Sequence, residues 1–205
     1  MIMEANRMKI GLTGSIACGK STVSAYLREL GYAVVDADAL SHALTSPGGA
    51  ALPALRSAFG DAVFDGEALN RRRLGQLVFA DAAMRERLNA LLHPMICREI
   101  ISRLRALDTE GGLVFGDIPL LYECGLDAHV DRVWVVCASP QAQLSRLMAR
   151  DGLTRAQAQQ RIAAQMPLEE KARRADACIT TDISLSDTRR QVLALLRSTC
   201  ERRQP

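Results

Sequence analysis

The sequence GSIACGKS, residues Gly14–Ser21, fits the phosphate-binding loop pattern G-x-x-x-x-G-K-[ST]. An apolar run, Ile10–Thr13, precedes it, and a stretch with helical character, Thr22–Leu30, follows it. This strand-loop-helix order is the context in which the pattern binds phosphate, and a chance match in a glycine turn would not require it. The segment therefore predicts a protein that binds a nucleoside triphosphate.

The chemistry of such a loop needs these residue types at this spacing. The glycines let the backbone curl around a phosphate chain, so that N–H groups point inward at the positive end of the following helix. We expect Lys20 to reach the β and γ phosphates and Ser21 to give a hydroxyl ligand to Mg²⁺. The expected triphosphate contacts are Gly14, Ser15, Ile16, Ala17, Cys18, Gly19, Lys20, Ser21 and Thr22.

Length and charge limit the class of protein. A chain of 205 residues with 48% hydrophobic content can bury one α/β core and carry a small inserted lobe. The formal net charge is +3, and because the only lysines are Lys9, Lys20 and Lys171, almost every positive charge is an arginine. The arginines are spread along the chain among acidic residues, whereas a nucleic-acid partner favours a concentrated basic stripe. We therefore predict no nucleic-acid partner.

The six cysteines predict buried, reduced thiols, because several of them lie in apolar runs. They form no C-x-x-C pair and have no regular spacing, unlike a zinc site or a disulfide framework. Residues Met1–Arg7 lack the apolar core of a secretion signal, and no stretch of about 20 apolar residues occurs. We predict a cytoplasmic protein without a membrane partner, and its oligomeric state stays open.

Apolar runs of strand length alternate with helical stretches, which predicts an α/β fold with a parallel sheet of five strands. The segment between the second and third runs, about 39–108, is too long and too helical for an ordinary crossover, so it predicts a separate helical lobe. The expected strands are Lys9–Thr13, Ala33–Asp36, Gly112–Gly116, Arg132–Cys137 and Ala177–Thr180.

Turn signals divide this lobe into helices. Pro47-Gly48-Gly49 and Asp65-Gly66 predict turns. The expected helices are Pro53–Phe59, Arg71–Phe79 and Ala82–Leu107. Pro94 lacks a backbone donor and disfavours helix at His93, so we expect an interruption there that turns His93 away from the regular helix face. A histidine that only packs or caps at the kink is the alternative.

A second helical insertion follows the fourth strand. Ser139-Pro140 predicts the start of a helix, Pro140–Arg150, and Thr154–Gln157 has capping-box spacing for another helix that Pro167 limits. The insertion carries Arg155, Arg161, Lys171, Arg173 and Arg174. It is either a lid over the triphosphate or a solvated charged hairpin. The expected domains are a nucleotide-binding core of residues 1–38, 109–150 and 175–205, an acceptor lobe of residues 39–108, and a lid of residues 151–174.

Among proteins with a phosphate loop, a small-molecule kinase fits best. A GTPase needs an [NT]-K-x-D element, and none of the three lysines fits it. A large ATPase usually needs an acidic cluster after a strand, whereas Leu113–Asp117 has one carboxylate and no adjacent glutamate. The Asp117 carboxylate could hold a Mg²⁺ water.

Two carboxylates are candidates for the catalytic base. Asp36 and Asp38 lie at the end of the second expected strand, where ligands bind in open α/β sheets. A carboxylate can orient an acceptor hydroxyl beside the γ-phosphate and take its proton. Alternation along an extended segment places the two on one side, and capping of the next helix is the alternative role.

Six segments in this order resemble the dephospho-coenzyme A (dephospho-CoA) kinase family, and the resemblance covers Met8 to about Leu196. Apart from the phosphate loop, each is weak alone, but the combination is specific. The segments are GSIACGKS at Gly14–Ser21, DAD at Asp36–Asp38, LNALLHPMI at Leu88–Ile96, DIPLLYECGL at Asp117–Leu126, SPQAQLSRLMARDGLTRAQAQQRIAAQMP at Ser139–Pro167, and EEKARRADACI at Glu169–Ile179.

The resemblance implies transfer of the ATP γ-phosphoryl group to the ribose 3′-hydroxyl of dephospho-CoA, with Mg²⁺, in the last step of coenzyme A synthesis. It implies that Asp38 is the base and that Arg146 and Arg150 contact the ATP phosphates. Lys20, Asp38 and Arg146 are then the expected catalytic residues. The implied residues on the acceptor side are Asp38, His93, Pro119, Leu120, Leu121 and Glu123.

One loop departs from the family pattern. Members commonly carry N-x-G after the last strand, in a loop expected near adenine, and this chain has Thr181 and Ile183 at the two fixed positions. The resemblance therefore says little about its contacts with the base. The other functions considered are a nucleoside or shikimate-type kinase, which would lack the HP and DIPLLYE segments, and a nucleotide-binding regulatory module without an acceptor.

Overall fold

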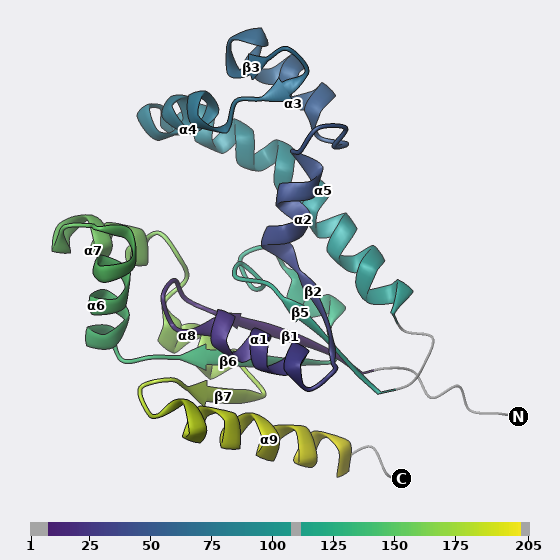
Figure 1. The fold of residues 1–205 in the computed structure, drawn as a ribbon, viewed down its shortest axis with the longest axis vertical. Helices are drawn as coiled ribbons and strands as arrows, with labels where there is room; N and C mark the ends of the chain where they lie inside the picture. The colour runs from purple at the N-terminus through teal and green to yellow at the C-terminus, as the bar shows by residue number, and fades with distance from the viewer. Residues whose placement is uncertain (1–7, 108–111, 202–205) are drawn as a thin grey trace, which may run out of the picture. The chain divides into compact units, whose positions relative to one another are not determined.

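Five strands form the parallel sheet that carries the phosphate loop in the computed structural model, which describes residues 8–107 and 112–201 (Figure 1). The strand order is β2-β5-β1-β6-β7. The central strand β1 pairs with β5, where Ile10 faces Phe115, and with β6, where Leu12 faces Trp134. The strands are β1 (Met8–Gly14), β2 (Ala33–Asp36), β5 (Leu113–Asp117), β6 (Arg132–Cys137) and β7 (Ala177–Thr180). All five expected strands are confirmed, and no end differs by more than one residue.

The chain divides into two units with separate cores. One, the sheet unit, holds the described residues up to Val35 and from Leu104 onward, and the other, the helical unit, is Asp36–Arg103. Residues 1–7, on which the expectation about a secretion signal rests, lie outside the described residues.

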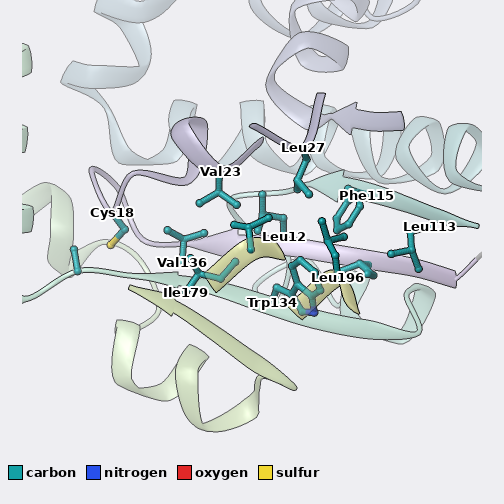
Figure 2. Packing of buried hydrophobic residues seen from close by; sticks show 13 residues of the cluster. Leu12, Cys18, Val23, Leu27, Leu113, Phe115, Trp134, Val136, Ile179 and Leu196 are labelled. Atoms are coloured by element: carbon teal, nitrogen blue, oxygen red, sulfur yellow. The ribbon is translucent and has the colours of Figure 1, made fainter. Parts of the chain in front are cut away.

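Helices α1 and α9 bury their apolar faces on one cluster of the sheet unit (Figure 2). Val23 and Leu27 of α1 meet Phe115 of the sheet there, and the Phe115 and Trp134 ring centroids are 5.4 Å apart. Burying each such side chain contributes roughly 1.5–3 kcal/mol, so this cluster fixes the helix that follows the phosphate loop. The helices of this unit are α1 (Lys20–Glu29), the 3₁₀ helix η3 (Leu126–His129), α6 (Pro140–Asp151), α7 (Arg155–Ala163), α8 (Leu168–Arg174) and α9 (Leu185–Glu201).

The helical unit packs around Leu55, Phe64 and Leu74. The turn signal at Asp65-Gly66 is confirmed, because it joins two short antiparallel strands and Gly66 has φ +60°. Gly48, in the other expected turn, has φ +79°. The elements are α2 (Ala37–Leu44), α3 (Leu52–Phe59), the 3₁₀ helix η1 (Asp61–Val63), β3 (Phe64–Asp65), β4 (Ala68–Leu69), α4 (Arg71–Ala80) and α5 (Ala82–Ala106), whose residues from Leu104 onward are counted with the sheet unit.

The expected interruption at His93-Pro94 is wrong, because α5 is helical on both sides of Pro94 and through it. A proline inside a helix removes one backbone donor and crowds the preceding turn. The apolar side chains of the neighbouring turns, Leu91, Leu92 and Met95, pack against the core of the helical unit and offset that cost. His93 therefore lies on a regular helical turn.

Candidate functional site

The backbone of the phosphate loop is shaped for an anion. A Cβ atom on Gly14 would lie 2.7 Å from the carbonyl oxygen of Val136, so only glycine fits where the loop leaves β1. Ala17 has φ +60° and Gly19 has φ +84°. Left-handed residues at alternating positions turn successive N–H groups into one concavity. A left-handed alanine costs about 1–2 kcal/mol, and strain of this kind gathers at functional sites.

Lys20 is held at the carboxyl ends of the central strands. Its Nζ atom forms an ion pair with Oδ1 of Asp117, the last residue of β5. The side chain of Lys20 is 16% exposed and that of Asp117 is 6% exposed, so water screens the pair little. Ser21 and Thr22 lie exposed in the first turn of α1. The first turn of α1 therefore carries one oriented ammonium group and two exposed hydroxyl groups.

Two glutamines hold the first half of the loop. Nε2 of the buried Gln143 donates to Oγ of Ser15 and to the carbonyl of Ile16, both at 2.8 Å. Oε1 of Gln165 accepts from Ser15 Oγ at 3.0 Å and from the Ile16 N–H at 2.8 Å. Gln143 lies in α6, and Gln165 lies between α7 and α8. Sequence reasoning missed both glutamines, because no local motif marks a partner so distant in the chain.

Arg146 lies against the loop that follows β7. Its guanidinium donates to Oγ1 of Thr181 at 2.8 Å and to the Thr181 carbonyl at 2.7 Å. Asp182 Oδ1 is 3.5 Å from the same group. The Thr181 hydroxyl donates to the carbonyl of Cys18, inside the phosphate loop, at 2.7 Å. Arg146, whose side chain is 39% exposed, is thus connected to the phosphate loop through Thr181.

A buried lysine holds both ends of the segment Pro119–Glu123. Nζ of Lys171, whose side chain is 0% exposed, donates to the Pro119 carbonyl at 2.9 Å and lies 2.8 Å from Oε1 of Glu123. Thr13 Oγ1 donates to the same carbonyl at 3.0 Å. The charge of Lys171 is therefore engaged inside the sheet unit.

Leu121 and Leu120 of this segment have different surroundings. Leu121 is 0% exposed and packs so closely on Gly11 that a Cβ there would lie 2.3 Å from its Cδ1 atom. Its side chain belongs to the core, which leaves no surface for the expected acceptor contact. Leu120 and Pro119 are half-buried and keep an accessible surface.

The expected capping box at Thr154 and Gln157 is confirmed and starts α7. This helix packs on α6 through Leu147 and Ala158, and Ile16 and Ala17 of the phosphate loop join that cluster. The insertion is therefore in contact with the loop, unlike an isolated solvated hairpin.

Besides Arg146, three more arginines of the α6–α8 region are engaged within the chain. Arg150 and Arg161 both pair with Asp151, and the two guanidinium groups lower the pKa of that carboxyl. Arg174 pairs with Asp127 and lies 4.2 Å from the ring centre of Tyr122, whose pKa burial raises to about 12.

In the helical unit, the two aspartates have different roles. Oδ1 of Asp36 accepts from the N–H groups of Asp38 and Ala39, both at 3.1 Å, so Asp36 is the N-cap of α2. Strand alternation does not apply to the pair, because the helix begins at Ala37. Asp38 lies exposed in the first turn of α2, and His93 lies half-buried in α5.

The six cysteines are free, as expected, but the expectation that they are buried holds only for Cys18, because Cys178 and Cys200 are exposed and the other three are half-buried. Burial raises the pKa of the Cys18 thiol, and burial beside Cys178 raises that of Cys137 to about 12. In the part of the chain that the structure describes, no group of three His, Cys, Asp or Glu side chains is arranged to hold a metal ion. No helix within residues 8–107 or 112–201 is long and apolar enough to span a membrane.

Comparison with known proteins points to one family. A family model described as dephospho-CoA kinase matches residues 8–187. A dephospho-CoA kinase of Symbiobacterium thermophilum is 50% identical over 194 residues, which are 93% of this chain and 81% of that protein. The crystal structure of TT1252 from Thermus thermophilus is 39% identical, with a TM-score of 0.77, and the match covers 94% of this chain and 97% of that one.

A shikimate kinase from Acinetobacter baumannii, solved with shikimate, shares the fold alone. It is 18% identical with a TM-score of 0.56, and the match covers 98% of this chain and 97% of that one. The fold is therefore common to several small kinases, whereas the sequence likeness is to the dephospho-CoA kinases.

Proposed function

The chain belongs to the dephospho-CoA kinase family, and from this premise we propose which of its residues carry out the transfer. The enzyme phosphorylates the ribose 3′-hydroxyl of dephospho-CoA with the γ-phosphoryl group of ATP, in the last step of coenzyme A biosynthesis. The roles of individual residues follow from the geometry of the two units, each taken by itself.

The observation that carries the proposal is Lys20, which is oriented by Asp117 at the start of α1. In the proposal, residues Gly14–Thr22 surround the β and γ phosphates and Lys20 neutralises charge on the group in transfer. A positioned cation acts there without reorganising during the reaction, which is the largest contribution that a protein makes to phosphoryl transfer. The ion pair with Asp117 holds the ammonium group in position.

The residues present also fit a magnesium ion. Mg²⁺ takes oxygen ligands and is usually held by one or two protein groups together with substrate phosphates. The exposed hydroxyl of Ser21 and the carboxylate of Asp117 are oxygen donors next to the loop, and we assign the direct contact to Ser21. The bound ion would neutralise phosphate charge.

On the acceptor side, we assign the base to Asp38. Asp38 is an exposed residue in the first turn of α2, and Oδ1 of Asp36 caps that helix. A carboxylate within hydrogen-bond reach can orient the ribose hydroxyl and accept its proton late in a loose transition state. We propose that the helical unit binds dephospho-CoA, with His93 as a further contact.

Pro119 and Leu120 complete the proposed acceptor contacts, since both keep accessible surface. Glu123, bound to Lys171 and to the Met166 N–H, acts in this proposal by holding the segment in place.

Arg146 and Arg150, both in the helix α6 that precedes the insertion at residues 151–174, are the proposed phosphate contacts of this region. Arg146 is the stronger candidate, because Thr181 orients it toward the phosphate loop, whereas Arg150 pairs with Asp151. The insertion would act as a lid that excludes water and so suppresses ATP hydrolysis. We propose that the reaction takes place in the cytoplasm, where ATP is supplied.

The test is to measure ADP and coenzyme A together, with dephospho-CoA present or omitted and with Mg²⁺ present or chelated. The proposal predicts one coenzyme A for each ADP, little ADP without the acceptor, and loss of both products without Mg²⁺. Equal ADP release with and without dephospho-CoA would contradict the proposed coupling, and full activity without a divalent cation would contradict the role of Ser21.

A further inference from the structure

We propose that Thr181 is a positioning residue that sets Arg146 against the phosphate loop. The proposal rests on the role given to Arg146 above and adds the group through which that role is exerted. Thr181 lies directly after β7, and its N–H donates to the Cys137 carbonyl at 3.0 Å, which fixes its backbone to β6. This backbone hydrogen bond anchors Thr181 independently of its side-chain contacts.

The Thr181 hydroxyl joins two elements of the site. It accepts a hydrogen bond from Arg146 at 2.8 Å, and it donates its single hydrogen toward the Cys18 carbonyl at 2.7 Å, with the Cys137 carbonyl farther away at 3.3 Å. A hydroxyl has one hydrogen and two acceptor lone pairs, so both kinds of bond are satisfied at once. One side-chain oxygen therefore connects the arginine to the loop that is proposed to hold the phosphates.

The same residue also fixes the plane of the guanidinium group. The second terminal nitrogen of Arg146 donates to the Thr181 carbonyl at 2.7 Å, next to the bond to the hydroxyl. Two neighbouring N–H bonds from one fork set direction as well as distance, which a single contact would not do. Asp182, whose other carboxylate oxygen accepts from the Ser139 N–H, adds a weaker contact at 3.5 Å.

Thr181 is in direct contact with the phosphate loop. A Cβ atom on Gly19 would lie 3.2 Å from both Oγ1 and Cγ2 of Thr181. The left-handed residue that precedes Lys20 therefore packs on the residue that holds Arg146. A shift of Thr181 would move Arg146 and disturb the phosphate loop at the same time. One side chain therefore affects the positions of both Arg146 and Lys20.

These contacts give Thr181 a role different from base recognition. Its hydroxyl hydrogen is directed to Cys18, so it has no donor left for an adenine ring. Loss of the hydroxyl should release one of the two bonds to Arg146 and one to the loop. Because one hydrogen bond to the charged Arg146 is lost and the bond to the Thr181 carbonyl remains, we expect kcat to fall about tenfold.

The experiment compares Thr181→Val with Thr181→Ser, each with and without Arg146→Ala. Valine keeps the shape and removes the hydroxyl, and serine restores it. Thr180→Val is the matched control, because Thr180 makes its hydrogen bonds in the structure through its backbone. The thermal midpoint of every variant is recorded, so that a folding defect is seen separately.

The proposal predicts that Thr181→Val lowers kcat about tenfold and leaves KM for dephospho-CoA unchanged. Its effect should be clearly smaller once Arg146 is alanine, when only the bond to the Cys18 carbonyl is left to lose. Thr181→Ser and Thr180→Val should retain nearly full kcat. The same tenfold loss in both backgrounds, or no loss in either, would overturn the positioning role. If Arg146→Ala alone leaves kcat intact, the role proposed for Arg146 fails first, and that of Thr181 fails with it.

Discussion

The candidate residues of the sheet unit are held by partners from distant parts of the chain, whereas those of the helical unit lie on exposed or half-exposed helical turns. Lys20 has Asp117, and Arg146 has Thr181. Asp38 is exposed at the start of α2, and His93 lies half-buried on one turn of α5. We therefore expect the candidate residues of the two units to respond differently to substitution.

This difference has a physical basis. Charge develops on the phosphoryl group during transfer, and donors aimed at it in advance stabilise it without further reorganisation. The acceptor needs one carboxylate that orients one hydroxyl, and an exposed aspartate in a first helical turn can do so after binding. Substitutions in the sheet unit should therefore disturb phosphoryl transfer or stability through more than one contact. Substitutions in the helical unit should change either phosphoryl transfer or stability, but not both.

The largest effect is expected for Lys20→Ala. Removing the ammonium group takes away charge stabilisation worth several kcal/mol in the transition state, so kcat should fall roughly 100-fold or more. The measurement is the steady-state rate of coenzyme A formation, with circular dichroism to show that the fold is intact. Near-normal turnover in a folded variant would remove Lys20 from the proposed mechanism.

Arg146→Ala is expected to have the next largest effect, with Arg150→Ala as its matched control. Loss of Arg146 should lower kcat about 10–100-fold with little change in KM for dephospho-CoA. Arg150, paired with Asp151 and 57% exposed, should change kcat only a few-fold. If Arg146→Ala raised only KM for dephospho-CoA, the residue would belong to the acceptor side, and the comparison between the units would have to be revised.

Lys171→Met tests the structural support of the sheet unit. The substitution keeps the apolar stem but removes the bonds to the Pro119 carbonyl and to Glu123, so we expect a loss of about 1–3 kcal/mol in the free energy of unfolding. The exposed Arg173 serves as control, and Arg173→Met should stay within about 0.5 kcal/mol of the parent. Urea unfolding measures both. Equal stabilities would mean that the buried ammonium group contributes nothing to the fold.

The smallest effect concerns the cap of α2. Asp36→Ala should lower stability by about 1 kcal/mol, because two N–H groups lose their acceptor, while Asp36→Asn should change little, because asparagine is an equally good cap. Thermal unfolding and kcat are measured on both variants. A strong loss of kcat in Asp36→Asn with unchanged stability would exchange the roles given to Asp36 and Asp38.

The five strands and several helix starts could be predicted because their signals are local. Each strand is an apolar run of the right length, and Thr154 with Gln157 forms the capping box that their spacing indicates. The cap at Asp36 was foreseen only as an alternative. Its oxygen starts the helix at Ala37, whereas strand alternation requires an extended segment through Asp38, and so it sets the position of Asp38.

The contacts that orient the site residues could not be predicted, because they join distant segments. Gln143 reaches Ser15 across 128 positions, and Lys171 reaches Pro119 across 52. No local sequence pattern identifies Gln143 or Lys171 as the residue that makes these contacts. The predicted interruption at Pro94 was wrong for a similar reason. Apolar packing of the neighbouring turns outweighed the local preference of proline against helix.

The most direct test of the proposed division between the two units is Asp38→Asn, measured in two ways. Calorimetric titration gives the ATP dissociation constant, and a single-turnover experiment with saturating dephospho-CoA gives the rate of phosphoryl transfer. We predict that the dissociation constant stays within about twofold of the parent while the transfer rate falls about 10²–10⁴-fold, because only the base is lost. A transfer rate close to that of the parent, or loss of ATP binding in step with transfer, would contradict the account.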